Sequence, residues 1–354
     1  MPDTGPVYLN ACSHGLPSAA VLDAVADHTG RERHDGPVTA FRNAAERLEV
    51  LYDRAGRILG APPSEIDIAA TTTSAWLGVV LRLNLVGRRI LVAPHEWGPN
   101  VRMLERLAAS AAASIEVLPD PTSGAPLSDW AARFDEDVAA IFTPMVSSIE
   151  GRRYPVEEIA DVPRPEGCRL IVDGAQAIGQ TDIDLGGIPC DAFLATTRKW
   201  VRAPRGTALA WVNPALGAPR PPRDIEPTDM PVSAHLALSE ALGEALDDGI
   251  AARAVRIGHL RDLARAGARE RGFDVLHGHE PMTGALALFV PQRYLEDVKT
   301  GLQASDVVVK FPDPERDEPA SPPVTGGSVL RVSPHIYNTE AEIECMIEAL
   351  PRIA

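Results

Sequence analysis

An aspartate and a lysine follow two apolar runs near the middle of this 354-residue chain. The run at 170–172 ends at Asp173, and the run at 192–195 is followed by the polar sequence TTRK, which ends at Lys199. Short continuous apolar runs are typical of strands that are buried on both faces of a parallel sheet. In such sheets, ligands bind beyond the carboxyl ends of the strands. The pattern therefore predicts that Asp173 and Lys199 face one ligand site.

This pair of side chains has a specific chemical use. A lysine amine can form a Schiff base with pyridoxal phosphate, and an acidic partner keeps the pyridine nitrogen of that cofactor protonated. The protonated ring withdraws electrons from the substrate α-carbon, and the lysine then serves as general base and acid. Taken singly, an aspartate at a helix N-cap and a surface lysine are the simpler interpretation. The sequence D-x-x-Q at 173–176, followed by TTRK at a strand end, favours the cofactor site.

The surrounding sequence predicts the elements that position these residues. Strands are expected at 66–70, 89–93, 115–118, 138–144 and 207–212, separated by helices that include 17–30, 38–59, 75–82 and 101–112. A proline-rich segment at 213–231 precedes a long helical pattern at 232–268, which breaks near 247–249. Further strands and helices follow it. This order indicates an α/β protein with a large domain at 15–231 and a small domain built from 1–14 and 232–354.

Composition and charge narrow the function classes. The net charge of −15 argues against a general nucleic-acid or anionic-membrane binder. The four cysteines are widely spaced and form no CxxC or CxxH cluster, so no metal site is indicated and a reduced, cytoplasmic protein is the simplest interpretation. The sequence shows neither a signal-peptide pattern at its start nor an apolar run of about 18 residues that would span a membrane.

Five short stretches resemble one family of enzymes. They are ACS (11–13), EWGPN (96–100), VDGAQ (172–176), RKWVRAPRG (198–206) and LRVSPHIYNT (330–339). From about residue 8 to its C-terminus the chain resembles the class V aminotransferase and cysteine desulfurase family of fold type I pyridoxal phosphate enzymes. The first, second and last stretches are similar to the branch of hercynylcysteine sulfoxide lyases, from ergothioneine biosynthesis, and related enzymes of lincosamide antibiotic pathways. The resemblance implies a mainly parallel central sheet, a small C-terminal α/β domain, pyridoxal 5'-phosphate as cofactor and a homodimer with shared active sites.

The resemblance also implies roles for the residues around the cofactor. Lys199 would carry the cofactor, Asp173 would pair with the pyridine nitrogen, and Gln176 would face the phenolic oxygen of the ring. Trp97 would stack on the ring, with His95 as the alternative if the alignment shifts by two residues. Backbone N–H groups and hydroxyls at the start of the helix after residue 70 make a phosphate site. The residues expected around the phosphate are Thr72, Thr73, Ser74, Thr196, Arg198 and, from the 213–231 segment, Thr228 of the partner subunit.

A second group of residues is implied at the substrate. Arg331 matches the family arginine that binds the substrate α-carboxylate through two parallel hydrogen bonds. Ser13 and His14 lie in a segment that lines the substrate entrance, although Ser13 could equally cap the helix that begins near Pro17. Ser148 stands where relatives often have asparagine or histidine, near the ring oxygen and the substrate amine, and an ordinary turn serine is the alternative.

The absence of one residue type bears on the reaction. In cysteine desulfurases the loop that matches 310–327 carries the cysteine that accepts sulfur, and this chain has no cysteine between Cys190 and Cys345. Because a thiolate is needed for that step, desulfuration through a persulfide is disfavoured. The leading prediction is β-elimination from an S-substituted cysteine or its sulfoxide, a small-molecule substrate, to give a thiol or sulfenate, pyruvate and ammonia. The alternatives are transamination or decarboxylation-coupled oxidative deamination of similar conjugates, and a non-catalytic cofactor-binding protein.

Overall fold

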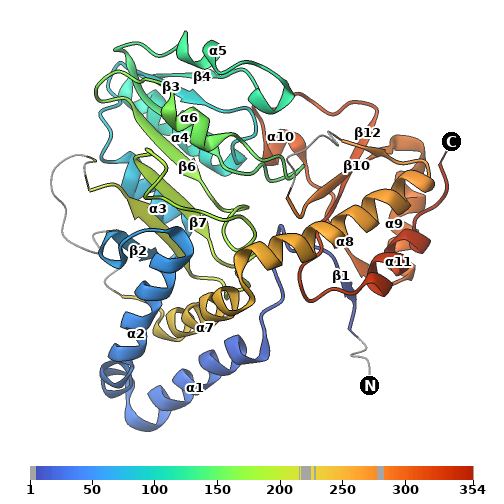
Figure 1. The fold of residues 1–354 in the computed structure, drawn as a ribbon, viewed down its shortest axis with the longest axis horizontal. Coiled ribbons are helices and arrows are strands. Elements are labelled where there is room, and N and C mark those ends of the chain that lie inside the picture. The colour runs from blue at the N-terminus through green and yellow to red at the C-terminus, as the bar shows by residue number, and fades with distance from the viewer. Residues whose placement is uncertain (1–4, 215, 217–224, 227–228, 277–282, 354) are drawn as a thin grey trace.

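A computed structural model describes residues 5–214, 216, 225–226, 229–276 and 283–353 (Figure 1). Its largest sheet has seven strands in the order β2-β8-β7-β6-β5-β3-β4. These strands are β2 (Ile66–Ala69), β3 (Arg89–Val92), β4 (Ser114–Val117), β5 (Val138–Pro144), β6 (Arg169–Asp173), β7 (Ala192–Thr196) and β8 (Ala208–Val212). Almost every residue of β5 to β8 is buried, as the continuous apolar runs predict. The mainly parallel central sheet is confirmed.

The connections within this sheet decide where a ligand site can form. All neighbouring strands are parallel except β8, which runs antiparallel to both β7 and β2. The chain passes from β2 to β3, then outward to β4, and returns to place β5 on the other side of β3. The strand order therefore reverses between β3 and β5. In open α/β sheets, the crevice at the carboxyl ends of such strands is the usual ligand site.

Helices cover both faces of the sheet and complete two apolar cores. On one face lie α1 (Ala19–Asp35), α2 (Pro37–Leu59), α6 (Val156–Asp161) and α7 (Val232–Asp248). The other face is covered by α3 (Thr72–Val80) and α4 (Gly98–Ala111), and a four-residue helix, α5 (Ser128–Ala131), follows β4. The apolar stripe of α2 is buried, and this helix ends at Gly60, whose φ of 61° is in the left-handed region that favours glycine.

The C-terminal part of the chain forms a smaller structure beside the main sheet (Figure 1). Its elements are α8 (Ile250–Glu270), β9 (Asp274–Val275), β10 (Leu286–Pro291), α9 (Leu295–Ala304), β11 (Val307–Val308), α10 (Pro314–Asp317), β12 (Gly327–Val332) and α11 (Glu340–Ala349). Three of the strands form an antiparallel sheet in the order β12-β10-β9. The N-terminal strand β1 (Val7–Tyr8) pairs in parallel with β11, so the first residues of the chain pack beside its last elements.

The long helical pattern after residue 232 is divided at Gly249, where φ is 77°. Helix α7 buries Leu238, Ala241 and Leu242 in the same core as α1 and α2, whereas α8 continues to the small sheet. The division into 15–231 and 1–14 with 232–354 stays a prediction, and this packing leads us to propose Gly249 as the junction. Within the described ranges, no helix combines the length and the apolar character that a membrane crossing requires.

Candidate active site

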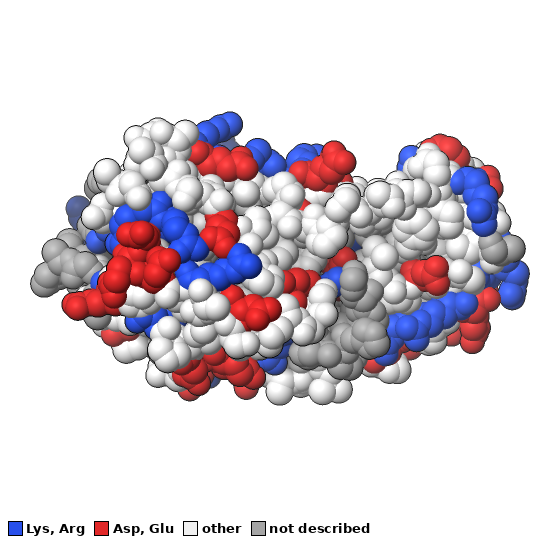
Figure 2. Space-filling model, turned by 90° about the horizontal axis from the view of Figure 1, so that it is seen from above, with Lys and Arg blue, Asp and Glu red and all other residues white. Residues whose placement is uncertain are grey.

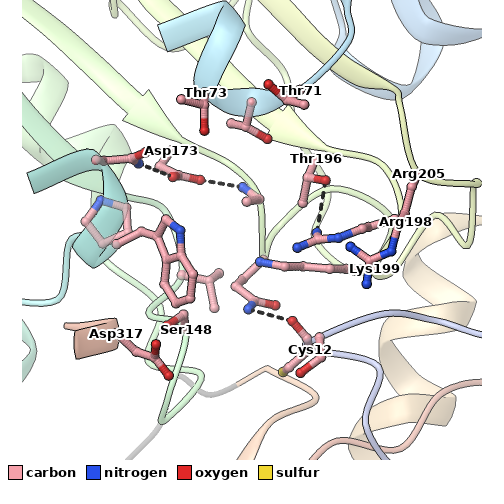
Figure 3. Close-up of a pocket in the computed structure, with 18 of the residues that line it drawn as sticks. Cys12, Thr71, Thr73, Ser148, Asp173, Thr196, Arg198, Lys199, Arg205 and Asp317 are labelled. Carbon is pink, nitrogen blue, oxygen red and sulfur yellow. Dashed lines mark hydrogen bonds between the residues drawn. The ribbon is translucent and has the colours of Figure 1, made fainter. Parts of the chain in front are cut away.

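A pocket of about 520 Å³ opens at the carboxyl ends of β5, β6 and β7, beside the reversal of strand order (Figure 3). Its walls come from the N-terminal segment, the start of α3, the loops after β3 and β5, and the region around β12. Because β8 is antiparallel, the turn that precedes it also reaches the pocket, through Arg205, Gly206 and Thr207. The sequence pattern does not reveal this direction, and Arg205 is therefore absent from the residues predicted around the phosphate.

Lys199 lies in this pocket three residues after β7 and is 8% exposed. Burial lowers the pKa of Lys199 to about 7, and the charge of Arg198 acts in the same direction. At neutral pH a large fraction of the amine is therefore unprotonated and able to act as a nucleophile or base. The N-terminal segment packs directly on this position, since the N–H of Gly15 donates to the carbonyl of Arg198 at 2.9 Å.

Asp173 ends β6 on the pocket wall and is held by two donors. Its Oδ1 accepts a hydrogen bond from the Ala175 N–H at 2.8 Å, and its Oδ2 accepts one from Asn100 Nδ2 at 2.9 Å. Burial raises the pKa of Asp173, while the Ala175 hydrogen bond and the charge of Lys199 act against this rise. A cationic group placed against Asp173 would keep the carboxylate ionised.

A second buried carboxyl group stands behind Asp173. Asn100 Nδ2 also donates to Glu96 Oε1 at 2.9 Å, so one amide bridges the two acids. Burial, followed by the charge of Asp173, raises the pKa of Glu96 to about 8. Each acid accepts two hydrogen bonds, since the Trp97 N–H also donates to Glu96 Oε1 at 3.0 Å. We assign the proton to Glu96, whose Oε2 is buried without a partner among the described residues, and the negative charge to Asp173, which is stabilised by the charge of Lys199. Sequence reasoning missed both Glu96 and Asn100, although the motif EWGPN places them four residues apart across the start of α4.

Gln176 is buried and its amide is fixed at both ends. Its Oε1 accepts from Trp200 Nε1 at 2.9 Å, and its Nε2 donates to the Cys12 carbonyl at 3.2 Å. Since an amide NH₂ has two donors, one N–H remains to face the pocket. Trp200 therefore acts by orienting this amide.

One end of the pocket combines a helix N-terminus with two arginines. Thr71 is the N-cap of α3, and Thr72 and Thr73 line the pocket beside it. Arg198 and Arg205 lie side by side opposite them (Figure 3). Burial and then the charge of Arg205 lower the pKa of Arg198. No carboxylate of the described residues pairs with either guanidinium, and this combination is suited to an anion such as phosphate.

The other predicted phosphate residues differ in where they lie. The Ser74 hydroxyl closes a capping box with Thr71 and does not line the pocket, so Thr71 takes its place in the wall. Thr196 lines the pocket and its Oγ1 accepts from Arg198 Nη1 at 3.1 Å. Thr228 lies outside the described residues.

The opposite end of the pocket is organised around Arg331 of β12. Its Nη1 donates to the Ser148 carbonyl at 2.6 Å and its Nη2 donates to Ser13 Oγ at 2.7 Å. Arg331 Nε and Ser148 Oγ are buried without a partner among the described residues, so two polar atoms beside the pocket remain available to a ligand. Ser13 is not a helix cap, because the N-cap of α1 is Ser18. His14 Nδ1 lies 2.7 Å from the Gly15 carbonyl oxygen, and His14 does not line the pocket.

The two aromatic candidates after β3, His95 and Trp97, differ in the groups that they contact. His95 Nδ1 lies 2.9 Å from a Glu318 oxygen and its Nε2 lies 3.3 Å from Asp120. Burial lowers the pKa of His95, but hydrogen bonds to these two carboxylates outweigh this effect and raise it to about 9. Both ring nitrogens are therefore engaged in ion pairs. Both residues line the pocket, but His95 is held by its carboxylates, which leaves Trp97 as the candidate for stacking, with its ring centroid 5.9 Å from Lys199 Nζ.

His335, within the stretch LRVSPHIYNT, is structural. It is buried, its Nε2 lies 3.0 Å from the Trp200 carbonyl, and its ring stacks on Trp200 and Tyr337. Burial lowers the pKa of His335 to about 3, so the ring is neutral.

These residues fit pyridoxal phosphate. The start of α3 with Arg198 and Arg205 suits the phosphate, Asp173 suits a protonated pyridine nitrogen, and Lys199 supplies an amine of lowered pKa. The unpartnered hydroxyl of Ser148 and the free N–H of Gln176 suit the polar edge of the ring. Bound in this way, the cofactor supplies an electron sink for a carbanion at the substrate α-carbon.

Solved structures share the fold. The chain superposes on a variant of C-DES that has glycine covalently linked to the PLP cofactor, with a TM-score of 0.86, 17% identity and 98% of each chain covered. A cysteine desulfurase from Thermococcus onnurineus NA1 gives a TM-score of 0.85 at 18% identity, covering 97% of this chain and 93% of that one.

Sequence comparison identifies relatives along the whole chain. A probable hercynylcysteine sulfoxide lyase from Mycobacterium tuberculosis (strain CDC 1551 / Oshkosh) is 28% identical, covering 99% of this chain and 90% of that protein. Isopenicillin N epimerase from Amycolatopsis lactamdurans is 29% identical, covering 99% of this chain and 96% of that protein. The family model "Aminotransferase class-V" matches residues 18–226. The chain therefore belongs to the aminotransferase class-V family, and pyridoxal phosphate is its cofactor.

Proposed function

We propose that this protein cleaves the carbon–sulfur bond of an S-substituted cysteine or its sulfoxide. The products are a thiol or sulfenate, pyruvate and ammonia. The observation that carries the proposal is the structure of the 310–321 region, where Arg316 and Asp317 line the pocket in place of a cysteine. The likeness to hercynylcysteine sulfoxide lyase supports a conjugate from thiol or secondary metabolism as the substrate.

The chain's own residues account for the steps of an elimination. Arg331 binds the α-carboxylate through its guanidinium, which fixes the orientation of the α-carbon relative to Lys199. The unprotonated Lys199 amine takes the α-proton, and Asp173 holds a proton at the pyridine nitrogen by its negative charge. The β-carbon–sulfur bond then breaks and the sulfur leaves with the bonding electrons. Addition of water to the remaining three-carbon unit releases pyruvate and ammonia.

One thiol of the pocket has to be tested separately. Cys12 lines the pocket and is 3% exposed, and sequence reasoning did not place it there. Its main-chain atoms are occupied, because its N–H donates to Ser333 Oγ and its carbonyl accepts from Gln176. A sulfur-accepting role would make Cys12 essential, whereas elimination does not use it.

The test follows products from S-alkyl-L-cysteines and their sulfoxides in the cofactor-loaded enzyme. The expected result is pyruvate together with an equal amount of thiol from the S-alkyl-L-cysteines, or of sulfenic acid from their sulfoxides, retained in Cys12→Ser and lost in Lys199→Ala. A keto acid or aldehyde that retains sulfur would indicate transamination or oxidative deamination, and a racemised amino acid would indicate epimerase chemistry. Alanine with sulfur transferred to Cys12 would indicate desulfuration. Each of these alternatives contradicts the proposal.

We further propose a homodimer with shared active sites. Support comes from large apolar side chains that are exposed along one region of the molecule, where Leu22 is 54%, Val38 71% and Phe41 47% exposed on α1 and α2. Exposed patches of this kind mark interfaces between proteins. Light scattering tests the mass, and mixing of Lys199→Ala with Thr228→Ala protein tests sharing, because hybrid dimers contain one site with both residues intact only if Thr228 serves the phosphate of the partner subunit.

All four cysteines are free, which supports a reducing compartment such as the cytoplasm. On the face shown in Figure 2, basic and acidic side chains are intermixed around uncharged ones. We therefore propose a small molecule, and neither a nucleic acid nor a membrane, as the partner of this protein.

A further inference from the structure

Lys310 lies directly beside Arg331 in an antiparallel bridge. The N–H of Arg331 donates to the Lys310 carbonyl at 2.7 Å, and the N–H of Lys310 donates to the Arg331 carbonyl at 3.2 Å. Residues that exchange both hydrogen bonds in this way project their side chains on the same face, with Cβ atoms about 5 Å apart. Both residues line the pocket. Two cations therefore stand next to each other at its substrate end.

The surrounding protein leaves this pair without counter-charge. Arg331 donates to two neutral acceptors, Ser148 O and Ser13 Oγ, and the Lys310 ammonium has no ion pair or hydrogen bond within the described part of the chain. Besides Asp173, the acid of the described pocket wall is Asp317, but its Oδ1 accepts from Arg316 Nε at 2.8 Å and its Oδ2 from the Asp313 N–H at 3.3 Å. Like charges placed directly opposite each other are destabilising.

The pocket wall as a whole also carries an excess of positive charge. Among the described residues that line it, six are lysine or arginine and two are aspartate. The cofactor phosphate balances the charges of Arg198 and Arg205. Lys199 would attach the cofactor, and Asp173 would pair with its pyridine nitrogen. The α-carboxylate of an amino acid balances Arg331 alone, which leaves one positive charge at Lys310.

We propose that Lys310 determines substrate choice by binding a second anionic group, carried on the sulfur substituent. This inference rests on the elimination proposed above and names its substrate class: S-substituted cysteines whose substituent bears a carboxylate or a comparable anion. A lysine suits this task because its flexible stem delivers a point charge to groups at different distances.

A simpler arrangement would have Lys310 share the α-carboxylate with Arg331. The two arrangements differ in one measurable respect. A shared α-carboxylate makes Lys310 equally important for every amino-acid substrate, whereas a second anion makes it important only for substrates that carry one.

The experiment compares S-carboxymethyl-L-cysteine with S-carbamoylmethyl-L-cysteine, which have the same shape and differ by one charge. We expect Lys310→Met to lower the ratio of kcat/KM for the acid over that for the amide by about 10-fold or more, the scale of one charged hydrogen bond. Lys310→Arg should keep the ratio within a few-fold of the wild type. Lys299→Met, which removes an exposed lysine of α9 outside the pocket, is the matched control and should leave the ratio unchanged.

Equilibrium binding separates this inference from the proposed reaction. Calorimetric titration of cofactor-loaded Lys199→Ala protein, with and without Lys310→Met, measures the acid-to-amide preference without turnover. Loss of that preference supports the inference even if neither substrate releases pyruvate, an outcome that would contradict only the proposed function. An equal loss of affinity for acid and amide, or an unchanged ratio, would overturn the role of Lys310.

Discussion

The two ends of the pocket are constructed differently. The cofactor end is local: Asp173 ends one strand, Lys199 follows the next, and Thr71 to Thr73 start the helix after a third. The substrate end joins segments that are distant along the chain, because Arg331 donates to Ser148 and to Ser13 across separations of 183 and 318 residues. In Figure 3, Thr71 and Thr73 lie on one side of Lys199 and Ser148 lies on the other.

Glu318 holds the substrate end together. Its Oε1 accepts from the N–H groups of Ser148 and Ile149 at 2.6 and 2.9 Å, and its Oε2 pairs with His95 at 2.9 Å. One buried carboxylate thus ties the 310–321 region to the loops after β3 and β5. The cofactor end is stabilised by secondary structure, whereas the substrate end depends on a few long-range polar contacts. Substitutions can therefore change the geometry of the substrate end without changing the chemistry at the cofactor end.

The largest effect is expected at the cofactor end, from Lys199→Ala. Loss of the amine removes both the covalent attachment and the general base, so pyruvate formation should fall by at least about 10³-fold. Mass spectrometry after borohydride reduction should find the cofactor on Lys199 in the wild type and on no residue of the variant. Turnover within tenfold of the wild type would show that another residue is the base.

Asp173→Asn comes next, with Glu96→Gln as its matched comparison. The first change removes the negative charge at the ring nitrogen, and we expect about a 10²-fold loss in kcat, the scale of removing one preorganised electrostatic partner. The second should change kcat by less than about threefold at pH 7, because burial raises the pKa of Glu96 to about 8 and its carboxyl group is already largely neutral. Equal losses in both variants would contradict this division of charge between the two acids.

The lowered pKa of Lys199 predicts a pH dependence at the cofactor end. The neutral amine forms the linkage, so the rate of pyridoxal phosphate uptake by apoprotein should rise with pH, level off above about 7, and be about tenfold lower at pH 6. Arg198→Gln removes a neighbouring cation that lowers this pKa, so the midpoint should move to higher pH. Stopped-flow absorbance measures both profiles, and a midpoint near 10 would contradict the effect of burial.

Glu318→Ala tests the substrate end. The change leaves two buried N–H groups unsatisfied and removes a carboxylate partner of the His95 imidazolium, so the free energy of unfolding should fall by about 3–5 kcal/mol. KM for the conjugate should rise more than the Kd for pyridoxal phosphate. Glu315→Ala, at an exposed position on α10, the short helix that ends just before Glu318, should leave all three quantities unchanged. A larger effect on the cofactor than on the substrate would show that the two ends are coupled.

This contrast also explains how much of the molecule the sequence predicts. Apolar runs with polar ends locate Asp173 and Lys199, because strand burial and the strand-end position of ligands are local rules. Glu318 lies in an acidic, proline-rich stretch that is typical of a solvated loop, and only the fold reveals the N–H groups and the imidazolium that it binds. Asn100 is missed for the same reason, since its partner Asp173 is 73 residues away. Arg205 reaches the phosphate end only because β8 is antiparallel.

The smallest expected effect distinguishes neighbouring hydroxyls at the start of α3. Thr71 is the N-cap of α3 and lines the pocket, whereas Ser74 contributes only to the capping box. Replacing either residue by alanine should lower the free energy of unfolding by about 1 kcal/mol through the lost cap. Thr71→Ala should in addition weaken binding of pyridoxal phosphate by a few-fold, as measured by fluorescence titration of apoprotein, while Ser74→Ala should not. Equal weakening of pyridoxal phosphate binding in both variants would contradict this distinction. It would show that phosphate binding depends on an ordered N-terminus of α3 and not on the Thr71 hydroxyl itself.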